Sequence, residues 1–294
     1  MELFQLRYFV KAAEFRSFTR AAEACCVSQP ALSQAIQKLE DELRQPLFER
    51  GGRQIGLSEA GQRFLPRATQ IIKLADEARA SITDDGETGT LRLSAIPTIA
   101  PYWLPRLAKS FADRFPKVQI ELGEDVTEMA LKRCRSGEID LALLALPLDA
   151  TDLDVVPLQE EVLLVALSKE HPLANAVEFS INDLEPFPFI LLDEVHCLAG
   201  SIVSFCKRHR LQPQTTNRSQ QLTTVLELVA HGFGVSFIPQ MAVERHADQR
   251  LIYRSIDGQR PTRQLAMCSN PYRFQSRVLK AMQSLVRDEL GKAS

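Results

Sequence analysis

Two cysteines nine positions apart, Cys197 and Cys206, lie in a stretch whose other residues favour a helix. Ile202, Phe205 and Cys206 fall at helical spacing, and Gly200 is the only weak helix former. A helix rises about 1.5 Å per residue, so the two Cα atoms would lie roughly 13 Å apart. A disulfide needs Cα atoms within about 4.4–6.8 Å of each other. Joining these thiols would therefore require the helix between them to unwind.

Three interpretations of this stretch are open. The first is that the cysteines are ordinary buried residues, since a free thiol packs as a small hydrophobic group. The second is a metal site, although the spacing departs from the usual zinc knuckle. Its four soft or borderline ligands would be His196, Cys197, Cys206 and His209. The third is a redox switch whose reactive thiol is Cys197, because the start of a helix favours a thiolate.

Length and composition indicate a globular protein with more than one domain. The chain has 294 residues, of which 45% are hydrophobic and 24% are charged, which is ordinary for a soluble protein. The sequence contains neither an apolar run of membrane-spanning length nor a signal peptide, so we expect a cytoplasmic protein without a membrane partner. In that compartment a disulfide is transient or sensory. Cys25, Cys26, Cys134 and Cys268 are interpreted as packing residues.

Charge gives little indication of a nucleic-acid partner. The net charge is −2, and residues 1–67 carry ten Lys and Arg against eight Asp and Glu, a local excess of +2. This bias is too small to identify a DNA-binding protein by itself.

The first sixty residues predict three helices and a hairpin. Ser17 caps the second helix and Ser28 the third, with Pro30 tolerated in the first turn of the third. The outer face of the third helix carries short polar side chains, which reading of the major groove requires. A hairpin follows at 47–57, where Arg50 and Arg53 can meet phosphates. The predicted DNA-binding residues are Ser28, Gln29, Pro30, Ser33, Gln34, Gln37, Lys38, Arg50 and Arg53.

This segment resembles the DNA-binding signature of LysR-type transcriptional regulators. The resemblance runs without a gap over about fifty residues and rests on Phe9, Ala12, Ala13, 17–22, 27–33, Ile36, Leu39, Glu40, Leu43 and 47–50. It implies a winged helix-turn-helix, double-stranded promoter DNA as a partner, RNA polymerase as a further partner, and a role such as transcriptional activator.

A long helix is predicted to open at Ser58 and to run to about Thr83, kinked but not ended by Pro66. Its apolar positions follow a heptad pattern, which is typical of a two-helix coiled coil. These positions are Phe64, Ala68, Ile71, Ala75, Ala78 and Ile82. The helix resembles the linker by which LysR-type proteins form a homo-dimer or homo-tetramer. Polar residues with two glycines at 84–89 mark a boundary.

The remainder alternates between short apolar runs and helical patterns, which predicts an α/β domain built on a parallel sheet. Strands are predicted at 91–96, 118–123, 139–145, 161–167, 188–192, 234–238 and 263–268, and helices at 101–115, 127–137, 198–210, 221–231 and 274–290. This half resembles the two-lobed regulatory domain of LysR-type proteins, which is like periplasmic binding proteins with Rossmann-like subdomains. The expected divisions are 1–58 for DNA binding, 59–90 for the linker, and 91–294 for regulation. Within the regulatory domain, lobe I is expected to comprise residues 91–162 and 265–294, and lobe II residues 163–264.

Ligands of open parallel sheets bind beyond the carboxyl ends of strands. Thr98 and Thr127 follow predicted strands at such points, although both are also explained as helix caps. Several further motifs resemble the OxyR-type peroxide sensors: 96–98, 101–102, 104–105, Thr127, 136–137, Asp140, 193–198 and Cys206.

The OxyR-type resemblance implies a site chemistry that needs no cofactor and no metal. Cys197 would be the peroxidatic thiol, oxidised to a sulfenic acid, and Cys206 the resolving thiol. Thr98, Thr127, His196 and Arg263 would hold hydrogen peroxide or water beside the sulfur. The family usually has Arg-Asp after His-Cys-Leu, whereas this chain has Ala199-Gly200. That departure removes two charges from beside the thiol.

Two other functions remain open on the same residues. A LysR-type regulator could bind a small-molecule inducer between its lobes, with the cysteines as bystanders. From a different class, the chain could be a thiol peroxidase that also binds DNA. The expectation adopted is a regulator that is not an enzyme and that senses hydrogen peroxide through reversible joining of Cys197 and Cys206.

Overall fold

The chain is described by a computed structural model that covers residues 1–49, 55–193, 197–211, 214–245, 248–258 and 260–291. It divides into two compact units, Met1–Asp84 and Asp85–Ser294. Among the described residues, none of the helices has the length and apolar character needed to cross a lipid bilayer.

The first unit begins with three helices, α1 (Leu3–Phe15), α2 (Phe18–Ala24) and α3 (Gln29–Leu43). Ser17 caps α2 by accepting a hydrogen bond from the amide of Arg20, and Ser28 caps α3 in the same way through Ala31. These caps satisfy amides that a helix leaves without partners at its first turn. The inner faces of the helices pack on a shared core that includes Leu6, Phe9, Ala21, Leu32, Ile36 and Leu39.

The predicted hairpin is present at its base. Phe48 and Leu57 form an antiparallel bridge, and the amide of Ser58 donates to the carbonyl of Leu47 at 3.0 Å. Arg50 and Arg53, the predicted phosphate contacts, lie outside the described residues.

Helix α4 (Glu59–Thr83) runs through Pro66 without ending, as predicted. The proposed coiled-coil seam needs a correction at its beginning. Ala68 is fully buried, and the ring of Phe64 lies 5.4 Å from that of Phe9, so these two positions pack within the first unit. Further along, Ile82 is 87% exposed. Only the later part of α4 therefore keeps apolar side chains available to a partner.

The second unit is built on a seven-stranded sheet. Its strands are β1 (Gly89–Ala95), β2 (Val118–Glu124), β3 (Leu141–Ala145), β4 (Asp154–Ser168), β7 (Ser236–Pro239), β8 (Leu251–Arg254) and β9 (Thr262–Ser269). The order is β2-β1-β3-β9-β4-β7, with β8 paired to β4. Within this sheet, over the described residues, the β1–β2 and β1–β3 pairs are the parallel ones, while the pairs made by β9 and β4 are antiparallel. The expectation of a parallel sheet was therefore wrong for the four pairs that involve β4 or β9, because these two strands run antiparallel to their neighbours.

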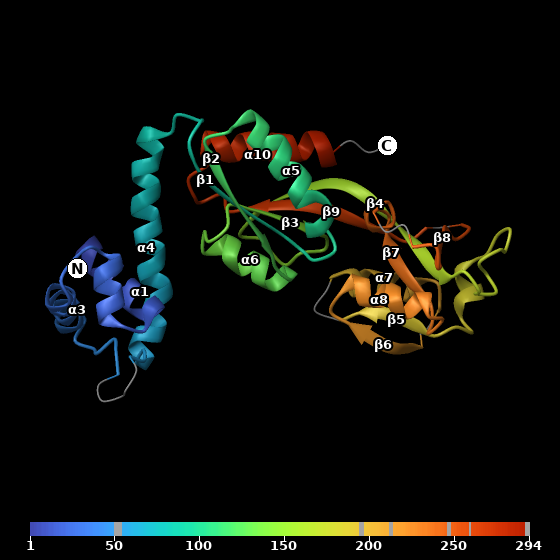
Figure 1. Ribbon diagram of the computed structural model, residues 1–294, viewed down its shortest axis with the longest axis horizontal. Helices are drawn as coiled ribbons and strands as arrows, with labels where there is room; N and C mark the ends of the chain where they lie inside the picture. Colours follow the sequence, from blue (N-terminus) through green and yellow to red (C-terminus); the bar gives the residue numbers. More distant parts are fainter. Residues whose placement is uncertain (50–54, 194–196, 212–213, 246–247, 259, 292–294) are drawn as a thin grey trace. The chain divides into compact units, whose positions relative to one another are not determined.

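Helices cover both faces of the β1–β3 part of the sheet. Figure 1 shows α5 (Ala100–Arg114) and α10 (Arg277–Leu290) on one face and α6 (Thr127–Arg135) on the other. Their apolar sides form a core with the sheet that includes Leu93, Leu107, Phe111, Leu143 and Met282. This is the α/β arrangement that the alternating sequence pattern predicted.

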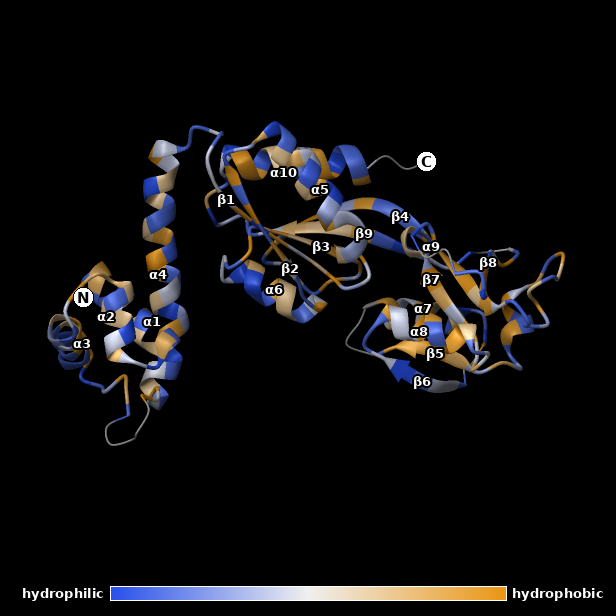
Figure 2. Ribbon diagram, viewed as in Figure 1, coloured by the Kyte–Doolittle hydropathy of each residue, from blue (hydrophilic) through white to orange (hydrophobic). Residues whose placement is uncertain are grey.

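A second core forms around a two-stranded parallel sheet, β5 (Phe189–Leu192) and β6 (Thr215–Ser219). Helices α7 (Cys197–Arg208) and α8 (Leu222–Ala230) belong to it, with the short α9 (Gln240–Val243) and the 3-10 turn at Ile181–Leu184. Strand β6 was not predicted, because it is polar along its whole length (Figure 2). Strand β8 and helix α9 were missed as well.

Glycines make the turn between α8 and β7 possible. Gly234 has φ +156°, and a side chain there would come within 2.3 Å of the carbonyl oxygen of Pro188. A glycine at position 234 is thus required by a close backbone approach.

Candidate functional site

Helix α7 begins at Cys197 and contains Cys206. Because the backbone between them is helical, their Cα atoms are separated by nine helical rises, or roughly 13 Å. The side chain of Cys197 and the whole of His196 lie outside the described residues. The structure therefore describes the helix that separates the two cysteines but not the surroundings of the first thiol.

Cys206 is completely buried in the second core, beside Phe205 and Leu211. This burial raises the pKa of its thiol to about 11, because the thiolate would lose its hydration. Cys206 is therefore a protonated, enclosed thiol near neutral pH.

The proposed metal ligands receive no support from the described part of the chain. His209 packs its ring 4.6 Å from that of Phe205. No group of three or more potential ligand residues occurs within the described ranges.

Arg263 lies at the centre of a buried polar cluster in the second unit. It comes from β9 and stands opposite Glu161 of β4 in the antiparallel register. Its Nε donates to Glu161 Oε2 at 2.7 Å, and the two side chains are 0% and 4% exposed. Pairing on neighbouring strands thus neutralises two charges that would otherwise be costly inside the protein.

The same guanidinium reaches the segment that follows β1. Arg263 Nη1 donates to Thr98 Oγ1 at 2.6 Å, and Nη2 donates to the carbonyl oxygen of Thr98 at 3.1 Å. The other oxygen of Glu161 accepts from the amide of Met241 at 2.9 Å. Arg263 therefore fixes Thr98 in place, while Glu161 fixes Arg263.

Thr127 is the first residue of α6 and follows β2, as Thr98 follows the neighbouring parallel strand β1. The two threonines thus come from the same edge of the sheet. The hydroxyl oxygen of Thr127 is buried and has no hydrogen-bond partner among the described residues. A buried hydroxyl without a partner is available to a small polar ligand.

Tyr102 joins this region to both cores, since its half-buried side chain packs against each of them. Burial raises the pKa of its hydroxyl, and the positive charge of Arg263 partly opposes that shift. Helix α7 packs against β5 and β9, the latter being the strand that carries Arg263.

The structure thus brings Thr98 and Arg263 into direct contact and places Thr127 at the same sheet edge. Sequence reasoning missed Glu161. A charged residue opposite Arg263 on a neighbouring predicted strand was the available signal, but the strand order was needed to recognise it.

The predicted DNA-reading face of α3 is accessible. Gln34, Gln37 and Lys38 are exposed, as are Ser28, Gln29 and Pro30, and Ser33 is half-buried. Gln29 donates to Ser33 at 2.8 Å and Gln37 to Asp41 at 2.8 Å, so two of the amides are oriented along the helix. The face offers both donors and acceptors, as base edges require.

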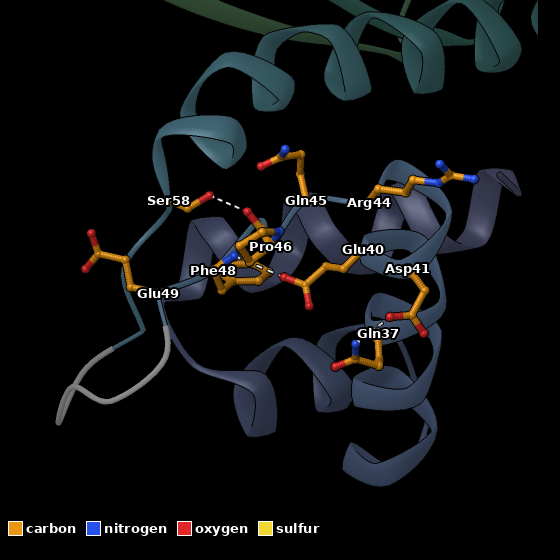
Figure 3. Close-up of a pocket in the computed structure, with 9 residues that line it drawn as sticks. All are labelled: Gln37, Glu40, Asp41, Arg44, Gln45, Pro46, Phe48, Glu49 and Ser58. Atoms are coloured by element: carbon orange, nitrogen blue, oxygen red, sulfur yellow. Dashed lines mark hydrogen bonds between the residues drawn. The ribbon is translucent and has the colours of Figure 1, made fainter.

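A hollow of about 630 Å³ lies beyond the C-terminal end of α3 (Figure 3). Its lining residues are Gln37, Glu40, Asp41, Arg44, Gln45, Pro46, Phe48, Glu49 and Ser58. Glu40 has a structural role there, because its carboxylate accepts from the amides of Leu47 and Phe48 at 2.6 and 3.2 Å. Three carboxylates against one guanidinium make this wall unsuited to DNA phosphates, although Gln37 belongs both to the hollow and to the predicted DNA-reading face.

Two family models match the chain. The model of the bacterial regulatory helix-turn-helix protein, lysR family, matches residues 3–62, and that of the LysR substrate binding domain matches residues 84–291.

The chain is also similar to characterised proteins and solved structures. It is 34% identical to the DNA-binding transcriptional dual regulator OxyR of Escherichia coli (strain K12), over 92% of this chain and 90% of that one. A full-length OxyR variant from Pseudomonas aeruginosa superposes with a TM-score of 0.80 at 29% identity, over 98% of this chain and 95% of that one. A cysteine mutant of Corynebacterium glutamicum OxyR with H2O2 bound superposes with a TM-score of 0.67 at 31% identity, over 98% of this chain and 92% of that one.

Proposed function

Because this chain belongs to the LysR family of bacterial transcriptional regulators and matches OxyR proteins along most of its length, we propose that it senses hydrogen peroxide. In this proposal oxidation joins Cys197 to Cys206, and the joined form contacts promoter DNA differently from the reduced form.

The observation that carries the proposal is the position of both cysteines in α7. Their Cα atoms lie roughly 13 Å apart in a helix, about twice the separation that a disulfide allows. The bond therefore cannot form until α7 loses its helical structure. A chemical event at two sulfur atoms would in this way change the shape of the regulatory unit.

The chemistry consists of two steps. The Cys197 thiolate attacks one oxygen of hydrogen peroxide, the O–O bond breaks, and a sulfenic acid and one water are formed once the leaving hydroxide takes a proton. The Cys206 thiol then attacks the Cys197 sulfur, and a second water leaves as the disulfide forms. Because Cys206 is enclosed and protonated, the second step requires its helix to open first.

Thr98, Thr127, His196 and Arg263 are proposed to hold the peroxide during the first step. The buried hydroxyl of Thr127, which has no hydrogen-bond partner within the described residues, supports this assignment. So does the fixed position of Thr98 on Arg263. The C. glutamicum OxyR structure, which has H2O2 bound, matches this chain along 98% of its length.

The DNA target is proposed to be contacted by the exposed face of α3, from Ser28 to Lys38, and by the wing that carries Arg50 and Arg53. A homo-dimer or homo-tetramer would present two or more such helices, held by the later part of α4, where Ile82 is exposed. RNA polymerase is proposed as the partner through which the bound regulator acts as an activator in the cytoplasm.

The division of labour along the chain is proposed to follow the predicted boundaries. Residues 1–58 bind DNA, residues 59–90 form the linker between the two domains, and residues 91–294 sense the peroxide. Sensing takes place once per reduction cycle, so the chain is not proposed to be an enzyme. A thiol peroxidase would instead consume peroxide continuously in the presence of a cytosolic reductant.

The test compares the wild-type protein with Cys197→Ser and Cys206→Ser on promoter DNA. We expect peroxide to change the footprint of the wild-type protein and of neither variant, and we expect the reduced footprints of all three to agree. A Cys197→Ser variant that keeps the inducible response would contradict the proposal and support an inducer-binding regulator. Sustained peroxide consumption by the wild-type protein would support the enzyme instead.

A further inference from the structure

A second pair of thiols lies in the core of the β1–β3 part of the sheet. Cys134 is in the last turn of α6 and Cys268 is in β9, and both side chains are 0% exposed. The sulfur of Cys134 lies 3.8 Å from the backbone carbonyl oxygen of Cys268, although 134 positions separate the two residues in the chain. Both are free thiols.

The two thiols also shift each other's pKa. The Cys134 thiol is directed at the backbone carbonyl of Cys268. Interaction between the two side chains lowers the pKa of Cys268 and raises that of Cys134. Arg135, next to Cys134, favours the Cys268 thiolate further through its positive charge, while burial opposes it. Of the two, the Cys268 sulfur is therefore the better nucleophile.

We propose that Cys134 and Cys268 are a second redox-active pair, which hydrogen peroxide converts to a disulfide inside the core. Nothing in this pair depends on Cys197 or Cys206, so the inference stands apart from the proposed function. In contrast to the α7 cysteines, which lie nine helical positions apart, the sulfur of Cys134 already lies 3.8 Å from the backbone carbonyl oxygen of Cys268.

The reaction is balanced with one peroxide molecule. The Cys268 sulfur attacks one peroxide oxygen and becomes a sulfenic acid as the first water leaves. The Cys134 sulfur then attacks the Cys268 sulfur, its proton goes to the leaving hydroxyl, and the second water departs. Two thiols are oxidised to one disulfide, and the peroxide is reduced to two waters.

The bond would connect two elements of the candidate site. Helix α6 begins at Thr127, and β9 carries Arg263. Joining Cys134 to Cys268 would fix these elements to each other by a covalent bond. In the chain-entropy account, closing a loop of this length stabilises the folded protein by an amount that corresponds to a rise in Tm of about 10 °C.

The experiment uses the full-length Cys197→Ser variant, in which the proposed switch cannot form. The protein is treated with hydrogen peroxide, unfolded in the presence of N-ethylmaleimide, and mapped by non-reducing peptide mass spectrometry. We expect a peptide pair linked through Cys134 and Cys268, and a rise in Tm of about 10 °C that dithiothreitol reverses. Full labelling of both thiols after peroxide treatment would overturn the proposal, as would linkage of either thiol to another cysteine.

Matched variants identify the source of the change in Tm. Adding Cys134→Ala, or separately Cys268→Ala, should remove both the linked peptide and the rise in Tm. Adding Cys26→Ser, a change at an exposed cysteine, should leave both intact. A rise in Tm that persists in both alanine variants would also overturn the proposal, because it would come from a different group.

Discussion

The guanidinium of Arg263 is fully enclosed, so the protein itself has to neutralise its charge. Glu161 does so, and the remaining donors of Arg263 are directed at Thr98. Neither charge can be removed alone without leaving the other buried and unpaired, which is far more costly than losing an exposed pair. The position of Thr98 thus depends on a carboxylate that does not touch it.

Glu161→Gln tests this dependence. The change keeps the size of the side chain but removes its charge, and we expect a loss of about 3–5 kcal/mol in the free energy of unfolding, measured by urea denaturation. The neighbouring exposed Glu160 gives a matched control, since Glu160→Gln should cost no more than about 1 kcal/mol. Equal effects of the two changes would contradict the role given to Glu161.

The enclosed state of Cys206 predicts its reactivity. Raising the thiol pKa from 9.0 to about 11 lowers the thiolate fraction about a hundredfold below pH 9. In the reduced folded protein, alkylation of Cys206 by iodoacetamide should therefore be at least about a hundredfold slower than in urea, and should accelerate as the pH rises toward 11. Mass spectrometry of the labelled peptide measures both rates. Equally fast labelling in the folded and unfolded protein would contradict this account of the site.

At the scale of elements, α7 determines how readily the proposed bond can form. Gly200 is exposed in this helix, and an added Cβ would meet nothing within 4 Å. A helical glycine weakens its helix by about 0.5–1 kcal/mol relative to alanine. This chain has Ala199-Gly200 at the position where OxyR-type proteins usually carry two charged residues, so α7 combines fewer nearby charges with a weaker helix.

Gly200→Ala should therefore slow formation of the Cys197–Cys206 disulfide about two- to fivefold, because a more stable helix opens less often. The rate is followed by quenched thiol labelling after peroxide addition. Ser284→Ala, at an exposed position of α10, is a matched control, because it raises helix propensity without touching α7. A control variant that slows the reaction as much as Gly200→Ala would rule out local opening as the cause.

Elements with a strong pattern were predicted well from the sequence. Capping serines gave the starts of α2 and α3, and apolar runs gave β1, β2 and β9. Strand β6 was not predicted, because its residues are polar and, among the described strands, it pairs with β5 alone. Phe64 and Ala68 appeared to belong to a dimer seam, since a helical repeat does not reveal which neighbour covers it.

At the scale of the whole molecule, the exposed face of α3 is the proposed contact with DNA. Gln34→Ala removes an amide that can pair with a base edge, and we expect affinity for promoter DNA to fall by about 1–3 kcal/mol at fixed salt. Gln45→Ala, on the wall of the carboxylate-rich hollow, should leave affinity unchanged. Electrophoretic mobility shifts would measure both. Comparable losses would place the DNA interface elsewhere on the first unit.

The candidate site could be predicted only in part, for reasons that concern the whole chain. Thr98, Thr127 and Arg263 followed from the family resemblance, and the structure brings Thr98 and Arg263 together. Glu161 and the contact between Cys134 and Cys268 depend on pairings between residues about one hundred or more positions apart. No local pattern shows such pairings. Cys26 was predicted to pack, yet it is exposed in the turn after α2.

Hydrogen exchange across 198–206, measured on reduced protein and on protein whose Cys197–Cys206 bond has been verified by peptide mapping, tests the central claim most directly. In the reduced protein the amides of α7 should exchange slowly, as expected for a helix that packs on a core. In the joined protein they should exchange as freely as an unstructured segment. A verified disulfide accompanied by unchanged protection of these amides would contradict the account, because the bond would then have formed without unwinding the helix.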